Sequence, residues 1–410
     1  MKEPKIRLKG YSGEWETKSL SEILTISTEQ NKRNVFTKED VFSVSDDFGI
    51  VNQIKHLGRS YAGKSLTGYK VLRTNQVVYT KSPLRAKPYG IIKVNEAGVG
   101  IVSVLYAIYD VNEGTNPKFI DRYFEPSYRT NNYLLPLINK GAKNTINISD
   151  QIAINGSIYL PADKNEQIAI CAYLDKLDHQ IQNTSRKIDS LRQIKAASLQ
   201  SMFPQEGETK PRVRFKGFEG EWENVPLFSF AKKSTEKNGN MNYTITLTNS
   251  AEYGVINQRD FFDHDISNDE HINGYYVIHN DDFVYNPRIS ASAPVGPINR
   301  NRLGYSGVMS PLYLIFKVEG INKDFLSYFF KTKLWHNYMK LEGNTGARFD
   351  RLAISDAQFF NMPVIMPKQE KEQIVIASFF TNLDTQITLQ AQRLEKLKQI
   401  KSACLDNMFV

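Results

Sequence analysis

Residues 58–65 read Gly-Arg-Ser-Tyr-Ala-Gly-Lys-Ser, which fits the spacing of a phosphate-binding P-loop letter for letter. Such a loop cradles phosphates with its backbone N–H groups, and it needs a buried strand before it and a helix after it. Here a polar run at 52–56 precedes the loop, and Leu-Thr-Gly-Tyr at 66–69 follows it. We therefore do not expect nucleotide binding here.

Two other groups of residues suggest chemistry that their context does not favour. The aspartates and His264 within 260–265 could hold a cation, but the other half of the chain has no such cluster, and an acidic surface turn is the commoner explanation. Asn286-Pro287 begins like the Asn-Pro-Pro-aromatic motif of adenine methyltransferases, but Arg288 follows. The sequence therefore indicates neither a metal site nor a methyl-transfer site.

Loops with basic, hydroxyl and amide side chains follow equivalent strands in the two halves and suit phosphate and base-edge contacts. An ordinary solvated loop is the alternative, and recurrence of the basic cluster favours contact. A second pair contains Gly-Ala-Lys and Gly-Ala-Arg, where glycine permits close approach to a phosphate and a structural turn is an equally good interpretation. The predicted DNA contacts are Lys64, Lys81, Ser82, Arg85, Lys87, Lys143, Asn144, Asn286, Arg288, Ser290, Thr345, Arg348 and Arg351.

The composition also favours a polyanionic partner. The 410 residues carry a net charge of +8 with a pI near 9.1, and the excess is uneven, +7 over residues 1–206 and +1 over 207–410. No apolar run is long enough for a membrane span, and no export signal follows the charged N-terminus, so we expect a cytoplasmic protein. Cys171 and Cys404 lie in apolar helical patterns and are interpreted as small buried hydrophobes.

An internal repeat at an offset of about 206 residues organises the chain. Its start is Arg-x-Lys-Gly-x-x-Gly-Glu-Trp-Glu, at 7–16 and again at 214–223. Its end is a Leu-x-Gln-Ile-Lys…Met-Phe segment, at 191–203 and again at 397–409. The stretches between are much less alike, so we expect a common scaffold carrying two different surfaces.

Each unit begins with short runs rich in β-branched and aromatic residues and ends in a helical pattern about 36 residues long, roughly 55 Å. Apolar residues recur there at heptad spacing, so the two helices should pair as a coiled coil, antiparallel because parallel helices would bring both domains to one place. Packing of each helix on its own domain alone is the alternative. The predicted interface residues are Leu174, Leu177, Ile181, Ile188, Leu191, Phe380, Leu383, Ile387, Leu394 and Leu397.

The doubled pattern Pro-x-x-x-x-Glu-Gln-Ile, at 161–168 and 367–374, leads in both halves into a long helix ending in Gln-Ile-Lys and Met-Phe. In this respect the whole chain resembles the specificity subunits of type I restriction-modification enzymes. The resemblance implies an α+β fold with two mixed α/β target-recognition domains, separated by the antiparallel helices and related by a pseudo-twofold. The expected boundaries are 1–164 and 205–370 for the domains, and 165–204 and 371–410 for the helical spacers.

The same resemblance implies a non-catalytic subunit. Each domain would read one part of a bipartite site in double-stranded DNA, and the helices would set the gap and dock two modification (methyltransferase) subunits. S-adenosylmethionine, ATP and Mg²⁺ would be cofactors of partner subunits and not of this chain; whether two restriction-translocase subunits join stays open. The rival hypothesis is an enzyme, a nuclease or a nucleotide hydrolase built on residues 58–65.

Overall fold

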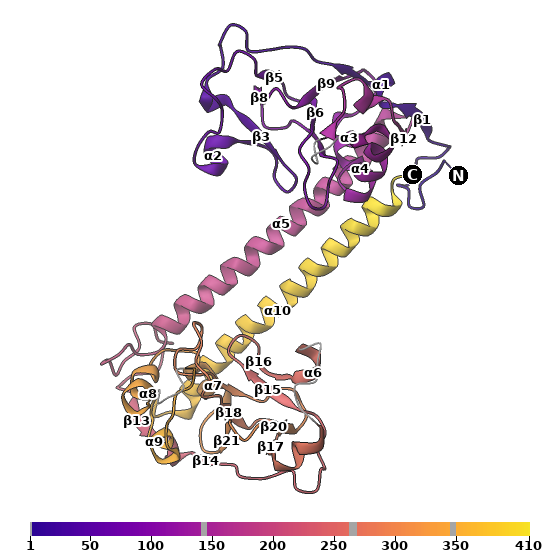
Figure 1. Cartoon of the computed structure of the whole chain (residues 1–410). Coiled ribbons are helices and arrows are strands. Elements are labelled where there is room, and N and C mark those ends of the chain that lie inside the picture. Colours follow the sequence, from indigo (N-terminus) through magenta and orange to yellow (C-terminus); the bar gives the residue numbers. More distant parts are fainter. Residues whose placement is uncertain (1, 141–145, 262–268, 345–349) are drawn as a thin grey trace. The chain divides into compact units, whose positions relative to one another are not determined.

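The computed structural model describes residues 2–140, 146–261, 269–344 and 350–410. It divides into two compact units, Met1–Ser185 with Gln392–Val410 (unit 1) and Arg186–Ala391 (unit 2). Each unit combines one sheet-rich domain with parts of two long helices, α5 (Lys164–Ser201) and α10 (Glu370–Asn407) (Figure 1). The last part of α10 therefore packs in the unit that holds the N-terminal domain.

The described domain of unit 1 is built on a four-stranded antiparallel sheet in the order β2-β9-β6-β7, with the hairpin β3–β4 and the pairs β1–β12, β5–β8 and β10–β11 around it. Its strands are β1 (Glu16–Ser19), β2 (Leu24–Ile26), β3 (Phe42–Ser45), β4 (Gly49–Asn52), β5 (Lys70–Leu72), β6 (Val77–Thr80), β7 (Ile91–Val94), β8 (Gly100–Val102), β9 (Ala107–Val111), β10 (Asn139–Lys140), β11 (Ile146–Asn147) and β12 (Ser157–Leu160). Its short helices are α1 (Leu20–Ile23), α2 (Gln53–Leu57), α3 (Pro117–Tyr123) and α4 (Ser127–Leu134), with 3₁₀ turns at Lys38–Asp40, Leu135–Leu137 and Ile152–Ile154.

The described domain of unit 2 repeats this order, with the sheet β14-β21-β18-β19, the hairpin β15–β16 and the pairs β13–β22 and β17–β20. Its strands are β13 (Glu223–Pro226), β14 (Ala231–Lys233), β15 (Leu247–Ser250), β16 (Gly254–Asn257), β17 (Tyr276–Ile278), β18 (Phe283–Tyr285), β19 (Ile298–Arg300), β20 (Gly307–Met309), β21 (Leu314–Val318) and β22 (Pro363–Met366). Its short helices are α6 (Gln258–Phe261), α7 (Lys323–Phe329), α8 (His336–Glu342) and α9 (Asp356–Phe360), with 3₁₀ turns at Leu227–Ser229 and Asp269–Gly274. The two domains therefore share one topology, as the repeat predicts.

One inner strand of each four-stranded sheet, β6 or β18, is buried on both faces. In β6, Val77 and Tyr79 belong to the core on one side and Val78 to the core on the other, because successive side chains of a strand point to opposite faces. In β18, Phe283 and Val284 divide between two cores in the same way. The strand ends from which the predicted contact loops start are therefore rigidly held.

The two long helices pair in antiparallel sense within each unit. In unit 1, Leu174 and Leu177 near the start of α5 share a core with Leu397 and Leu405 near the end of α10. In unit 2, Leu191 of α5 shares a core with residues early in α10. The predicted interface residues Leu174, Leu177, Ile188, Leu191, Phe380, Leu383 and Leu397 are buried, and Ile181, Ile387 and Leu394 are half-buried.

The repeated Glu-Gln pair fixes the start of each long helix to its own domain. Glu166 accepts two hydrogen bonds of 2.8 Å from the guanidinium of Arg7. Gln167 accepts from the backbone N–H of Asn116 at 2.8 Å and donates to the carbonyl of Pro161 at 2.9 Å. Equivalent bonds join Glu372 to Arg214 and Gln373 to Asn322 and Pro367 in unit 2.

The repeated Met-Phe pair fixes the end of each long helix into the other half's domain. Phe409, at the end of α10, packs edge-on against Trp15 at 6.4 Å between ring centroids. Phe203, after α5, packs against Trp222 at 5.8 Å. The start and end motifs of the repeat are therefore in contact. The Trp of each start segment packs against the Phe that follows the long helix of the other half.

Candidate nucleic-acid interface

The loops that follow β6 and β18 share one backbone frame. The hydroxyl of Tyr79 donates to the carbonyl of Tyr89 at 2.7 Å, and that of Tyr285 donates to the carbonyl of Val295 at 2.9 Å. Each loop returns through a glycine with positive φ, Gly90 or Gly296, whose added Cβ would lie 2.0 or 2.1 Å from a carbonyl oxygen at the start of the loop. Both loops are therefore anchored where they start and where they return to the sheet, while the residues between these two anchors differ from one loop to the other.

The loop of unit 2 is joined to a second segment that carries Arg351. The N–H of Ile289 donates to the carbonyl of Asp350, and that of Leu352 to the carbonyl of Pro287, both at 2.9 Å. This pairing brings Arg288 and Arg351, two predicted contact residues distant in the sequence, into adjacent positions.

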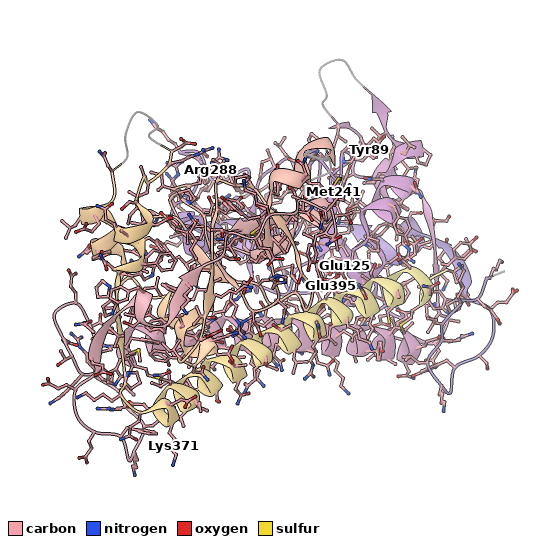
Figure 2. All side chains as sticks on the ribbon, turned by 90° about the horizontal axis from the view of Figure 1, so that it is seen from below. Tyr89, Glu125, Met241, Arg288, Lys371 and Glu395 are labelled. Carbon is pink, nitrogen blue, oxygen red and sulfur yellow. The ribbon has the colours of Figure 1, made fainter. Side chains whose placement is uncertain are left out.

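The guanidinium of Arg288 is largely free to reach a ligand. Its side chain is 71% exposed, and its Nε lies 3.9 Å from the Asp350 carboxylate, at the outer limit of an ion pair. Figure 2 shows Arg288 at the surface of unit 2, far from Lys371 on α10. A cavity of about 260 Å³ opens beside it, lined also by Asn286, Tyr313 and Arg351. Fork-shaped donors with neighbouring amide and aromatic groups suit both phosphates and base edges.

The side chain of Asn286 is fixed by hydrogen bonds, and the sequence did not predict the residues that form them. Its side-chain amide donates to the carbonyl of Asn249 at 3.0 Å, and its Oδ1 accepts from the N–H of Arg288 at 3.0 Å. The nearly buried Asn249 is in turn bonded to Asn299 at 2.7 Å. These partners lie about 40 to 50 positions apart, so only the sheet topology reveals that they act together.

In unit 1 some predicted contact residues are exposed, and others are already paired with groups of the protein itself. Ser82 and Arg85 are exposed, as are Lys64 in its own loop and Ser290 in unit 2. Lys81 is largely covered and pairs with Asp150 at 2.8 Å. This carboxylate also pairs with Lys70 at 2.9 Å; burial alone would raise the pKa of Asp150, and the two lysines outweigh it and lower that pKa.

Lys87 lies in the interior and not on the loop surface. Its side chain is 1% exposed, pairs with Asp46 at 2.7 Å and donates to the carbonyl of Glu125 at 3.1 Å. An ammonium so enclosed binds partners within the domain and is not presented to a ligand. The predicted contacts Lys143, Asn144, Thr345 and Arg348 lie outside the described residues.

The segment that fits the P-loop spacing has another structure. It begins at Gly58, the left-handed cap residue that follows the end of α2 at Leu57, and leads through turns to β5 without an intervening helix. Over the ranges that the structure describes, no group of three or more potential ligands could hold a metal ion, and no helix has the length and apolar character needed to cross a bilayer. Three of the residues weighed as a cation site, Asp263, His264 and Asp265, fall outside those ranges.

Comparison with protein families matches residues 219–399 to the type I restriction modification DNA specificity domain. Residues 219–399 are therefore similar to this domain family. The match includes the Arg288 loop, Arg351 and most of α10. Because the domain of unit 1 has the same order of strands, the same sheet and the same helix-anchoring contacts, the chain carries the fold of the specificity domain twice. Comparison with curated proteins gave no match.

One solved structure with a TM-score above 0.5 has a similar fold, and two others are similar at lower scores. The S subunit of a type I restriction-modification system from M. genitalium matches with a TM-score of 0.56 at 12% identity, covering 100% of this chain and 99% of that one. A chain from a structural study of assembly and conformational transition of the type I R-M system has a TM-score of 0.49 at 16% identity, covering 96% and 97%. The HsdS subunit from Thermoanaerobacter tengcongensis has a TM-score of 0.48 at 16% identity, covering 100% and 99%.

Proposed function

We propose that this chain is the DNA-reading specificity subunit of a type I restriction-modification complex, in which each domain reads one part of a bipartite target. The observation that carries the proposal is the pair of equivalent loops, alike in their anchors and different in their exposed side chains. A common frame with different tips lets two related domains read two different base sequences.

In this proposal the chain itself catalyses nothing. Two modification subunits would dock on the paired helices and bring S-adenosylmethionine, and any restriction subunits would bring the ATP and Mg²⁺ site. The repeated helix motifs support two copies of one partner, since a doubled scaffold offers two similar faces. The working location would be the cytoplasm, where the DNA is.

The test of DNA reading is Arg288→Gln in the complex with its modification subunit. If Arg288 contacts a base edge, the variant should lose about 1–3 kcal/mol of affinity and relax the preference at one position of one half-site, leaving the other half-site unchanged. Mapping methylated adenines in DNA from cells carrying each variant reads both halves at once. Arg212→Gln, which removes an equally exposed charge outside the loop, is the matched control.

The spacing role has a separate test. Inserting seven residues into both α5 and α10 should lengthen the unspecified gap between the two half-sites while the bases read stay the same. A gap that stays fixed would contradict the helices as the determinant of spacing. Methyl transfer by the isolated chain would contradict the non-catalytic assignment.

A further inference from the structure

Arg129, on α4 of unit 1, is a buried cation with an incomplete set of partners. Its residue is 8% exposed, and its guanidinium lies 5.4 Å from the ring centroid of Tyr123, 5.5 Å from that of Tyr128 and 4.9 Å from that of Phe409. Its Nη1 is buried and has no hydrogen-bond partner among the described residues. Burial lowers the pKa of Arg129, which shows that the charge is kept there at a cost.

The fold does not require a cation at this position. The equivalent residue of unit 2, 206 positions on, is Trp335, which is 2% exposed and donates its indole N–H to the carbonyl of Phe330 at 3.3 Å. There an aromatic ring fills the space and its polar group is satisfied. Unit 1 therefore keeps a buried, under-bonded guanidinium where its own sister domain shows an apolar alternative.

A cavity of about 870 Å³ lies against Arg129. Tyr123, Tyr128 and Tyr133 also line it, and Asn132, Lys5 and Glu3 add exposed polar groups. The carboxylate of Asp406, also in its wall, accepts a hydrogen bond from the Tyr128 hydroxyl at 3.1 Å. This volume is within the range of small-molecule sites, and aromatic rings beside a guanidinium can take a flat ring and an oxyanion together.

We propose that this cavity binds a small phosphate-bearing ligand with a planar ring, of the mononucleotide class, with the guanidinium of Arg129 taking the phosphate and the tyrosine rings taking the base. The Nη1 group of Arg129 is the donor that the described residues leave unpaired. Lys5 adds a second positive charge at the wall, which the carboxylates of Glu3 and Asp406 also line. The site lies wholly within unit 1, and it does not depend on the proposed DNA reading by the loops.

The test is calorimetric titration of the full chain with AMP, adenosine and inorganic phosphate. AMP should bind more tightly than either of its parts, and Arg129→Met should weaken AMP binding about tenfold or more, because a charge-assisted hydrogen bond is lost. Arg59→Gln, which removes an arginine stacked on Tyr61 elsewhere in unit 1, should leave AMP binding unchanged.

A second variant keeps the proposal testable if Arg129→Met fails to fold. Asn132→Trp narrows the cavity from an exposed position without touching Arg129, and it should abolish AMP binding while the melting temperature stays near that of the parent chain. Phosphate binding as tightly as AMP would overturn the role of the aromatic wall. Absence of AMP binding at millimolar concentration, or equal AMP affinity in a folded Arg129→Met chain, would overturn the site.

Discussion

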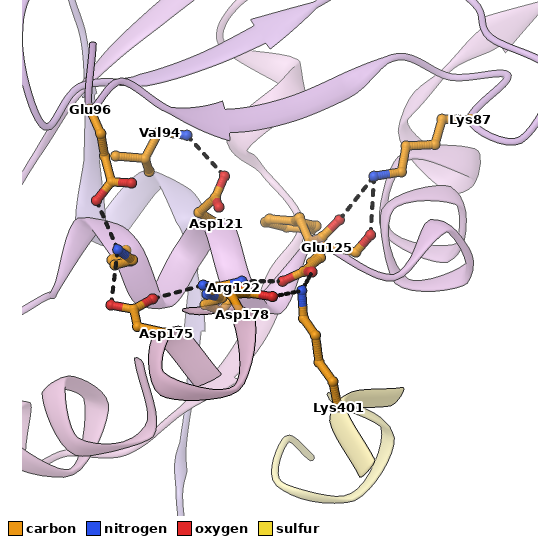
Figure 3. A network of polar contacts seen from close by, with 11 residues as sticks. Lys87, Val94, Glu96, Asp121, Arg122, Glu125, Asp175, Asp178 and Lys401 are labelled. Carbon is orange, nitrogen blue, oxygen red and sulfur yellow. Dashed lines mark hydrogen bonds and ion pairs between the residues drawn. The ribbon is translucent and has the colours of Figure 1, made fainter. Parts of the chain in front are cut away.

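The two units fix their domains to the paired helices with different chemistry. In unit 1, Arg122 of α3 binds Asp175 at 2.7 Å and Asp178 at 2.6 Å on α5, and Glu125 at 2.7 Å in its own domain. Lys401 of α10 closes the network by binding Glu125 and Asp178 at 2.5 and 2.6 Å (Figure 3). Arg122 thus binds all three carboxylates, Lys401 of the helix shares two of them, and Lys118 of the domain shares the third, Asp175, at 3.0 Å.

In unit 2 the position of Arg122 is taken by Tyr328 of α7. Its hydroxyl donates to Asp384 of α10 at 2.9 Å, and Lys195 of α5 binds the same carboxylate at 2.5 Å. The ammonium of Lys195 also lies 5.7 Å from the centroid of the Tyr328 ring. A lysine, Lys331, stands where unit 1 has a glutamate in its network.

We call the contact region between a domain and the paired helices a joint. Both joints contain one ion pair between the two helices, which the Lys of Gln-Ile-Lys forms with the Asp of Leu-Asp. The repeat preserves this helix–helix pair, whereas the domain reaches it with a guanidinium in one unit and a phenol in the other. Buried ion networks depend strongly on every member, while a phenol that loses its hydroxyl still packs. The two joints should therefore respond differently to the same kind of damage, except where their contacts are the same.

The largest loss of stability is expected at the Arg–Glu pairs that the two units have in common. Arg7→Met and Arg214→Met each leave a glutamate that is 1–2% exposed without its bidentate partner, which should cost about 3–5 kcal/mol. The two losses should match within about 1 kcal/mol, because the surrounding contacts are equivalent. Hydrogen exchange in β1 and β13, which lie next to the two start segments, measures each loss. A clearly larger loss in one unit would show that the anchors are not equivalent.

The next effect separates the joints. Arg122→Met should destabilise unit 1 by about 2–4 kcal/mol, because three carboxylates are left with fewer cations, although their partial exposure moderates the cost. Tyr328→Phe should destabilise unit 2 by only about 1 kcal/mol, since the ring stays. Hydrogen exchange in α3 and α7 compares the two directly. Equal losses would contradict the distinction between a charged and an aromatic joint.

The residues of the helices show what the sequence could predict. Leu174, Leu177 and Leu397 recur at heptad spacing, and a repeated apolar pattern of that length has few ways to be buried, so antiparallel pairing followed from the residues alone. The sequence shows that the Glu-Gln and Met-Phe motifs are repeated, but it does not show which residues they contact. Their partners are Arg, Asn and Trp side chains far away in the sequence, which only the fold brings to them.

The predicted contacts show where sequence reasoning stops. Lys87 and Arg85 stand two residues apart in one basic loop, yet one is buried against Asp46 and the other is exposed. Arg129 and Asn249 gave no signal, because a buried Arg or Asn looks like any other in a sequence. Which polar side chains turn inward depends on the loop's return path, and this path is set by contacts such as those of Gly90 and Tyr79.

A smaller effect tests whether the common loop frame matters as much in both units. Gly90→Ala and Gly296→Ala should each cost about 2–3 kcal/mol, since the new Cβ meets a carbonyl oxygen and φ is positive. Gly98→Ala and Gly304→Ala have positive φ with open space around them, so they should cost about 1 kcal/mol. Thermal unfolding gives the four values. If Gly90→Ala costs no more than Gly98→Ala, and Gly296→Ala no more than Gly304→Ala, the close approach of the loop ends does not hold the frame.

The smallest effect is a difference in acid sensitivity. In unit 1, burial would raise the pKa values of Glu125 and Asp175, but the neighbouring cations outweigh it and hold both pKa values below their ordinary range. The stability that these two groups contribute is complete above ordinary carboxyl pKa values, and it is lost as the pH falls through the lowered ones. Each unit also has a buried aspartate with a pKa raised by burial, Asp121 or Asp282, and protonation of this aspartate on acidification favours the fold in both units.

Acidification from pH 7 to pH 3 should therefore open the joint of unit 1 before that of unit 2, by a margin of about 1 kcal/mol. Pulse hydrogen exchange at one fixed labelling pH, after incubation at each acid pH, follows α3 and α7 in the same sample. Arg122→Met serves as the control: without Arg122, Glu125 keeps only Lys401 and Asp175 only Lys118 as a cation that lowers the pKa, so the difference in acid sensitivity between the units should shrink. Opening of α7 first would refute the charged joint as the acid-sensitive one.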